Sequence, residues 1–153
     1  MPRFRNSAKA VIIEDNRLLA IQNTDVLDRY HTLPGGGQRP FETLTDALKR
    51  ECTEELGVRV EVGDLLFIRE YIGKNHEFAE KDGDAHQIEF YFRCDIIGET
   101  GDMVGEIPDK TQTGVEWLEL DRLDHHRLYP KVLCDLLKAG GLESKPAYLG
   151  DVN

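Results

Sequence analysis

Hydrophobic and polar positions near the start of the chain predict a β-hairpin. The segments 8–14 (AKAVIIE) and 17–22 (RLLAIQ) are rich in residues that favour strands, and Asp15 and Asn16 separate them. Asp and Asn tolerate the left-handed backbone that a two-residue hairpin turn requires. We therefore expect two antiparallel strands here, followed by a polar link over residues 23–31.

Two longer runs, 58–73 and 86–98, have the composition of β-strands. The second run alternates along its length, so one set of side chains faces one side of a sheet and the next set faces the other. These sets are Ile88, Phe90 and Phe92, and then Gln87, Glu89 and Tyr91. The polar segment 74–85 between the runs is either a long hairpin loop or a lid. A second loop, 99–113, precedes a short predicted strand at 115–118.

The pattern changes to helical spacing in two places. A helix is predicted from Thr43 to Leu56, because Thr43 is a suitable N-cap and Gly57 suits the left-handed residue that ends many helices. After Pro130, which favours a first helical turn, an apolar stripe predicts a second helix that ends before two glycines. The stripe and the glycines are Val132, Leu133, Leu136, Leu137, Gly140 and Gly141.

Strands and helices are mixed without the regular alternation of a doubly wound sheet, which favours an α+β fold with a mixed sheet between helices. With 153 residues, the chain is long enough for one domain with a hydrophobic core. We expect a single domain over residues 1–153 with a core of about 7–139. Residues 142–153 are weakly patterned and are expected either to form a flexible tail or to pack on a partner.

Composition narrows the class of partner. The net charge of −10, from 29 acidic and 19 basic residues, disfavours a nucleic-acid duplex or an anionic membrane surface. Three widely separated cysteines lack zinc-ligand or redox spacing, which favours a reduced, cytoplasmic protein. No segment has the ~20 apolar residues of a membrane span. A small phosphorylated ligand is compatible with this charge if cations screen the site.

The predicted helix changes character along one face. Leu44, Ala47 and Leu48 form an apolar stripe, and the positions seven residues further on are Glu51, Glu54 and Glu55. Because residues seven apart nearly coincide around a helix, the same face becomes acidic. Carboxylates near a helix C-terminus oppose the macrodipole and repel one another. The three glutamates are either a solvated helix end or an oxygen-ligand set for Mg²⁺ or Mn²⁺.

Two neighbouring features bear on this choice. Arg50 precedes the acidic cluster directly and can orient one of its carboxylates. The triplet Gly35, Gly36 and Gly37 stands before the helix, where glycine allows either a simple turn or a close approach of backbone to a ligand. No Gly-Lys-Ser/Thr follows, so the triplet is not a Walker loop.

The combined spacing is far more specific than either feature. Gly36 is followed after five residues by Glu42, and after seven more by Arg50-Glu51-Cys52-Thr53-Glu54-Glu55-Leu56-Gly57-Val58. This pattern resembles the signature of the Nudix hydrolases, the Nudix box, and all seven fixed residues are present. The preceding LPGG and the segments HQIEFYFRC and VEWLELDRL are similar to the family's flanking regions. The chain departs from the usual box at Arg39 and Phe41, which change the loop that enters the helix, and at Cys52, which behaves as a small hydrophobe and alters packing.

The resemblance implies an α/β/α sandwich with a central mixed sheet and a metal-dependent pyrophosphohydrolase. Such enzymes cleave a nucleoside diphosphate linked to another moiety, as in ADP-ribose or an oxidised nucleoside triphosphate. By resemblance, Glu51, Glu54, Glu55 and the Gly36 carbonyl would bind Mg²⁺ or Mn²⁺. Glu51, Glu54 and Arg50 would be catalytic, and the three glycines of 35–37 would contact substrate. Glu42 would have a structural role.

Three alternatives stay open. The catalytic base in some family members comes from a loop outside the box, and Glu106 or Asp109 could serve here. The fold could also be retained as a catalytically silent nucleotide-binding or sensor module, although such proteins usually lack a box glutamate. An isoprenoid diphosphate isomerase reaction uses the same fold. Family members are often dimers, so a homodimer is one expected assembly, without an interface that the sequence identifies.

Overall fold

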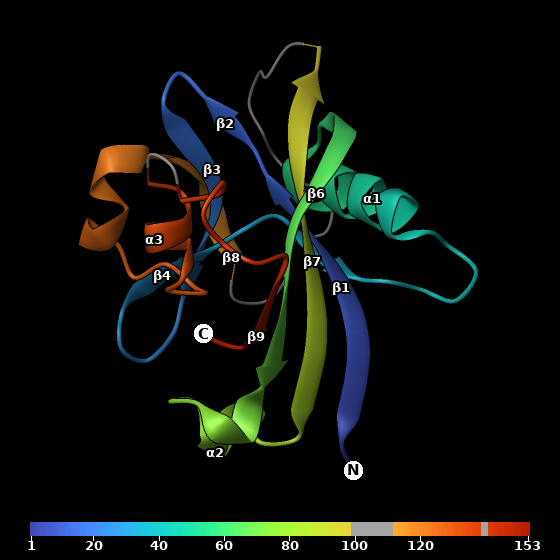
Figure 1. The fold of residues 1–153 in the computed structure, drawn as a ribbon, viewed down its shortest axis with the longest axis vertical. Helices are drawn as coiled ribbons and strands as arrows, with labels where there is room; N and C mark the ends of the chain where they lie inside the picture. The colour runs from blue at the N-terminus through green and yellow to red at the C-terminus, as the bar shows by residue number, and fades with distance from the viewer. Residues whose placement is uncertain (99–111, 139–140) are drawn as a thin grey trace.

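A computed structural model describes residues 1–98, 112–138 and 141–153, and two β-sheets dominate it (Figure 1). The larger sheet has five strands in the order β5–β1–β7–β6–β9. Strands β1 and β7 run parallel, as do β6 and β9, whereas the other pairs are antiparallel, so the sheet is mixed. Its strands are β5 (Gly35–Gly37), β1 (Arg3–Val11), β7 (Ala85–Ile97), β6 (Arg59–Ile72) and β9 (Tyr148–Asp151).

The smaller sheet contains the predicted hairpin. It is formed by β2 (Ile13–Glu14), β3 (Arg17–Thr24), β4 (Arg29–Thr32) and β8 (Gln112–Glu119), all antiparallel. Asp15 and Asn16 have φ values of 50° and 60°, which confirms the left-handed turn. The first predicted run is divided at Ile12, however. Its earlier part joins the larger sheet as β1, and only β2 pairs with β3.

Helix α1 (Leu44–Leu56) agrees with its predicted bounds. The Thr43 side chain accepts a hydrogen bond from the Asp46 amide at 3.1 Å, and Gly57 is left-handed with φ 68°. The apolar face of α1 packs against one side of the larger sheet, where Ala47, Leu48 and Cys52 are fully buried. This packing fixes α1 next to β5, so the acidic half of the helix faces the glycine strand.

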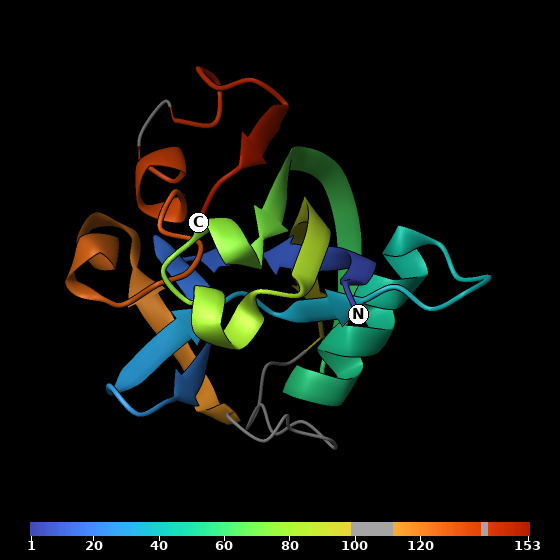
Figure 2. The same ribbon diagram turned by 90° about the horizontal axis from the view of Figure 1, so that it is seen from below.

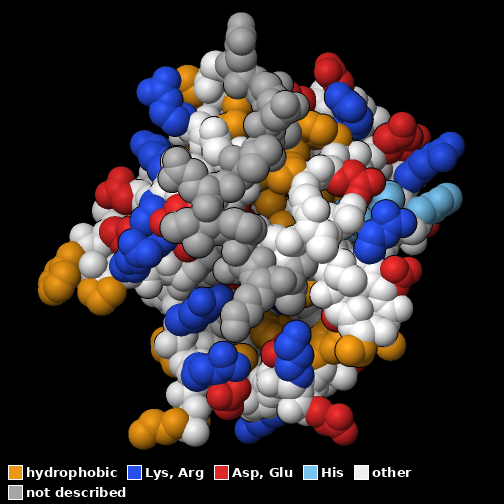
Figure 3. All heavy atoms as spheres, turned by 180° about the vertical axis from the view of Figure 1, so that it is seen from behind, with side chains coloured by type: hydrophobic (Ala, Val, Ile, Leu, Met, Phe, Trp, Pro, Cys, Tyr) orange, Lys and Arg blue, Asp and Glu red, His pale blue; other side chains and the backbone are white. Residues whose placement is uncertain are grey.

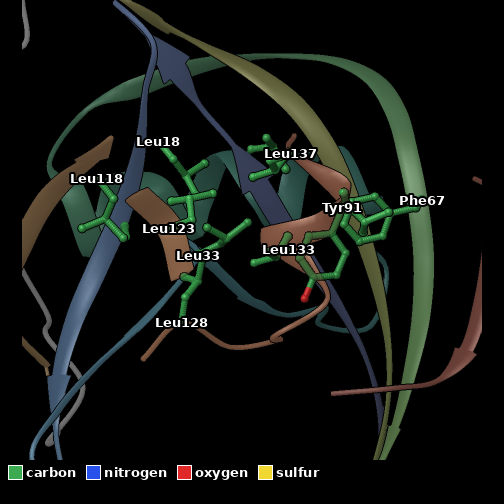
Figure 4. Packing of buried hydrophobic residues seen from close by; sticks show 12 residues of the cluster. Leu18, Leu33, Phe67, Tyr91, Leu118, Leu123, Leu128, Leu133 and Leu137 are labelled. Carbon is green, nitrogen blue, oxygen red and sulfur yellow. The ribbon is translucent and has the colours of Figure 1, made fainter. Parts of the chain in front are cut away.

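A second hydrophobic cluster lies on the other side of β1 (Figure 4). Phe67 from β6 stacks on Tyr91 from β7, with ring centroids 4.4 Å apart. Leucines from the smaller sheet and from the segment after η2 (Leu120–His125) complete the cluster. The two clusters cover opposite sides of the β-structure, so neither sheet has an entirely solvated face.

The C-terminal region differs from its prediction. Helix α3 spans only Leu133–Leu136, because the apolar stripe covers less than two helical turns. In place of a weakly structured tail, residues 148–151 form β9 alongside β6. The Ile68 amide donates to the Ala147 carbonyl at 2.8 Å, which ties this segment to the sheet.

Of the two predicted polar loops, the structure describes the first in full and the second only in part. The segment 74–85 includes the end of η1 (Gly73–Asn75) and all of α2 (Ala79–Asp82). Figure 2 shows α2 beside the last residues of the chain, where Asn153 donates to Glu77 at 3.0 Å. Most of the other loop, including Glu106 and Asp109, lies outside the described residues.

Charged side chains of both signs are interspersed over the described part of the rear face (Figure 3). Among the described residues, no helix is long and apolar enough to cross a membrane.

Candidate functional site

The glycine triplet forms strand β5 instead of the simple turn that is one of the two roles predicted for it. Gly35 has φ 134°, and a Cβ at this position would be 2.0 Å from the Ala8 carbonyl oxygen on β1. A Cβ at Gly36 would be 2.6 Å from the carboxylate carbon of Glu51. Glycine at these two positions therefore lets β5 fit between β1 and the acidic end of α1.

The three glutamates line the same cleft as the glycines. Glu55 Oε2 accepts a hydrogen bond from the Gly35 amide at 3.2 Å, and the Glu51 carboxylate lies against Gly36. All three side chains are partly buried, so they do not form a fully solvated helix end. Their convergence on one strand requires compensation of three negative charges.

Arg50 supplies part of that compensation. Its Nη1 donates to Glu51 at 3.0 Å and to Glu54 at 3.5 Å, while Nη2 donates to the Gly37 carbonyl at 3.0 Å. Nη2 and Nε also donate to the two oxygens of Glu42, at 2.7 and 3.1 Å. The hydrogen bonds from Arg50 lower the pKa of Glu42 to about 2, and those from Glu42 raise the pKa of Arg50.

The donor set fits a hard divalent cation. Three carboxylates and a backbone carbonyl offer only oxygen, which Mg²⁺ and Mn²⁺ prefer. Within the described residues, no group of three or more His, Cys, Asp or Glu side chains is arranged to hold an ion. Glu51 and Glu54 are instead turned toward Arg50. Their metal-binding and catalytic roles therefore stay predictions.

The cleft has a volume of about 1130 Å³ and lies between the two sheets. The smaller sheet contributes alternate side chains of one face, Ile21, Asn23, Tyr30 and Thr32, and the larger sheet contributes Arg5, Lys9, Arg69, Tyr71, Gln87 and Glu89. The side chains of Arg5 and Lys9 make no hydrogen bond or salt bridge to any described residue. The cleft thus combines an acidic end with cationic side chains along its floor.

A buried ion pair forms part of this floor. Arg69 Nε donates to Glu89 Oε1 at 2.7 Å, and the Tyr91 hydroxyl donates to the same oxygen at 2.6 Å. Burial opposes ionisation of Glu89, but the Arg69 charge prevails and the pKa of Glu89 is lowered. The alternation in the sequence separated the two faces of β7. It did not indicate that the polar face, which contains Glu89 and Tyr91, is the more deeply buried one. An acidic residue in an otherwise strand-like run, matched by an arginine in the neighbouring run, was the available signal.

Comparison with known proteins agrees with this geometry. The NUDIX domain family matches residues 3–136. A relative from Streptomyces ambofaciens described as a MutT-like protein is 31% identical over 136 residues, which cover 88% of this chain and 77% of the relative. The chain belongs to the Nudix family and is a Nudix hydrolase, which confirms the resemblance found in the sequence.

Solved structures confirm the fold. A NUDIX hydrolase from Nitrosomonas europaea matches with a TM-score of 0.70 at 19% identity, over 91% of this chain and 90% of that one. An ADP-ribose pyrophosphatase from Streptococcus suis matches with a TM-score of 0.57 at 20% identity, over 97% and 98%. At these identities the similarity supports the α+β Nudix sandwich and says nothing about substrate.

Proposed function

We propose that the protein is a divalent-metal-dependent pyrophosphohydrolase that cleaves a nucleoside diphosphate linked to another moiety. The substrate would be a nucleotide sugar such as ADP-ribose or a nucleoside triphosphate, oxidised forms included. The observation that carries this proposal is the convergence of Glu51, Glu54 and Glu55 on the glycine strand within one large cleft. Names of fold neighbours, which include an ADP-ribose pyrophosphatase, are compatible with it.

The charges in the cleft suit a diphosphate. Three glutamates alone would repel such a ligand, so Glu51, Glu54, Glu55 and the Gly36 carbonyl would hold Mg²⁺ or Mn²⁺ between themselves and the phosphates. When bound, the cation supplies charge neutralisation at phosphate oxygens and acidifies water. Arg5 and Lys9 line the same cleft and would neutralise those phosphate oxygens of the substrate that lie further from the glutamates.

The reaction would be attack of water on one phosphorus, with cleavage of the bond to the bridging oxygen. Glu51 or Glu54 would accept the proton of that water. Arg50, hydrogen-bonded to both glutamates, would hold their carboxylates in position beside the glycine strand. Glu42 would act through Arg50 and would not contact the substrate. Gly35, Gly36 and Gly37 would let the phosphates approach the backbone.

The whole chain would act as one domain, because β9 near the C-terminus completes the edge of the larger sheet beside β6. The expected cytoplasmic location and homodimer stay predictions. A catalytically silent binding module is the competing function, and it requires tight nucleotide binding without turnover.

The test is release of nucleoside monophosphate from ADP-ribose, 8-oxo-dGTP, dinucleoside polyphosphates and nucleotide sugars, with Mg²⁺ or Mn²⁺ and with EDTA. We expect turnover of at least one substrate, which EDTA abolishes. The double variant Glu54→Gln/Glu55→Gln should lose at least ~100-fold in kcat, since two charges of the cation site are removed. Absence of turnover across the panel in both metals, or unchanged turnover in the double variant, would contradict the proposal.

A further inference from the structure

Four aromatic side chains line the cleft, and three of them, from separate parts of the chain, contact one another. Tyr30 lies on β4, Phe78 directly precedes α2, and Tyr129 lies between η2 and α3. The Tyr129 ring makes a T-shaped contact with each of the other two, with centroids 6.0 Å from Tyr30 and 5.4 Å from Phe78. None of the three is fully buried, so their rings are not simply core residues.

Arg127 contacts all three rings of this cluster. Its guanidinium carbon lies 5.3 Å from the centroid of Tyr30, 6.0 Å from Phe78 and 5.6 Å from Tyr129. Asp25 accepts hydrogen bonds from both Nη atoms of Arg127, at 2.9 and 2.7 Å, and Arg127 Nε donates to the Tyr129 hydroxyl at 3.1 Å. The three rings are therefore fixed before any ligand arrives, which reduces the entropy lost on binding.

The cluster and the glutamates occupy different ends of one cleft. Strand β4 lies on the left and α1 on the right in both Figures 1 and 2, and the cavity includes residues from both. A ligand with its diphosphate at the glutamates would therefore extend toward the aromatic rings. An apolar, aromatic surface favours a flat ring over a sugar or a further phosphate.

We propose that Tyr30, Phe78 and Tyr129 form the subsite that binds the nucleobase of the substrate by ring contacts. This inference rests on the proposed function, because it assigns one end of the same cleft. Two polar side chains of the cleft already have partners: Asn23 donates to Ile21 and Thr32, and Asp25 is paired with Arg127. Contacts to ring faces do not depend on the pattern of donors and acceptors at the ring edge. The subsite requires a base and is tolerant of which base it receives.

Equilibrium binding separates this proposal from catalysis. AMP, GMP, UMP and ribose 5-phosphate are titrated calorimetrically into the full chain with Mg²⁺, since none of them contains a diphosphate bond to cleave. We expect AMP to bind about tenfold or more tightly than ribose 5-phosphate, the order of effect of one base–aromatic contact. The three nucleotides should differ less from one another than each differs from ribose 5-phosphate.

Variants test the ring contacts directly. Phe78→Leu should weaken AMP binding by about tenfold without changing ribose 5-phosphate binding, and Phe78→Trp should restore it. Phe4→Leu is the control, because Phe4 is an exposed aromatic residue outside the cleft. For a hydrolysed nucleotide, Phe78→Leu should raise KM and leave kcat nearly unchanged. Tyr30→Leu provides a second variant if Phe78→Leu does not fold.

The outcomes distinguish the two proposals. Equal binding of AMP and ribose 5-phosphate, no measurable AMP binding, or unchanged AMP binding in a folded Phe78→Leu variant would overturn the subsite. The tolerance for different bases would be overturned if one nucleotide bound more tightly than the other two by a larger factor than the one that separates AMP from ribose 5-phosphate. Base-dependent binding without any hydrolysis would support the subsite and contradict the enzyme, whereas hydrolysis without base dependence would do the reverse.

Discussion

Arg50 donates two hydrogen bonds to the two carboxylate oxygens of Glu42, at 2.7 and 3.1 Å, and the same guanidinium reaches Glu51 and Glu54. The loop before α1 is thereby connected to the acidic end of the helix through one side chain. The two fixed residues Glu42 and Arg50 of the signature thus have a structural explanation. Glu42 orients Arg50, and Arg50 orients the glutamates.

We expect Arg50→Lys to lower kcat by about tenfold or more with a small change in stability. Lysine retains the charge but cannot form the fork that contacts Glu42, Glu51 and Glu54 together. Steady-state kinetics on the best substrate of the panel and urea unfolding would measure the two effects. Arg39→Lys is the control, because the Arg39 side chain is largely exposed and its ion pair with Glu54 is long, at 4.0 Å. Equal kcat values for wild type and Arg50→Lys would remove the orienting role.

Alanine at neighbouring glycines should produce two different defects. At Gly36 the new Cβ would meet only the flexible end of Glu51, so Gly36→Ala should displace that carboxylate and weaken Mn²⁺ binding with little loss of stability. At Gly35 it would meet the Ala8 carbonyl, and φ is 134°, so Gly35→Ala should lose about 1–3 kcal/mol of unfolding free energy. Calorimetric Mn²⁺ titration and thermal unfolding of both variants would check this contrast. The reverse pattern would contradict the geometry of β5.

Local signals explain which parts of the fold could be predicted. The bounds of α1 depend on Thr43 and Gly57, and the hairpin depends on Asp15 and Asn16, so a few adjacent residues determine each. The glycine strand β5 depends instead on pairing with β1, and β9 depends on β6, more than 75 residues away. Such pairing is set by tertiary contacts, which no periodicity within the segment reveals.

The site divides in the same way. The spacing of Glu51, Glu54 and Glu55 on one helix face was readable from the sequence, and so was Arg50 beside them. The aromatic cluster has no comparable signal, since no local pattern separates its members from other residues of their types. Its members are Tyr30, Phe78, Tyr129 and Arg127. Their proximity arises because the segment after η2 crosses beside β4, where the Tyr129 amide donates to the His31 carbonyl at 2.9 Å.

Loss of one member of the buried pair Arg69–Glu89 should destabilise the protein more than replacement of both members. The side chains are only 7% and 6% exposed, so removing one charge leaves the other without compensation. We expect Glu89→Gln to lower the unfolding free energy by about 3–5 kcal/mol, and Arg69→Met/Glu89→Leu to lose less than Glu89→Gln. Urea unfolding of the three proteins measures these values. A loss in the double variant that equals or exceeds that of Glu89→Gln would show that the pair is itself strongly stabilising.

The stability of the protein should decrease on mild acidification because of His126. Burial and the adjacent His31, whose ring centroid is 5.3 Å away, lower the pKa of His126. His125 has the same effect, whereas Glu116 opposes it. The folded state therefore binds fewer protons than the unfolded state, so His126 contributes stability above about pH 6.5, the ordinary pKa of histidine, and loses it as pH falls.

Thermal unfolding across this range, with His126→Gln as the test variant, measures that contribution. The melting temperature of wild type should fall more steeply below about pH 6.5 than that of His126→Gln, because the variant lacks the titrating group. His125→Gln is the control, since His125 is 67% exposed, and its profile should follow wild type. Parallel curves for wild type and His126→Gln would show that this histidine does not couple protonation to folding.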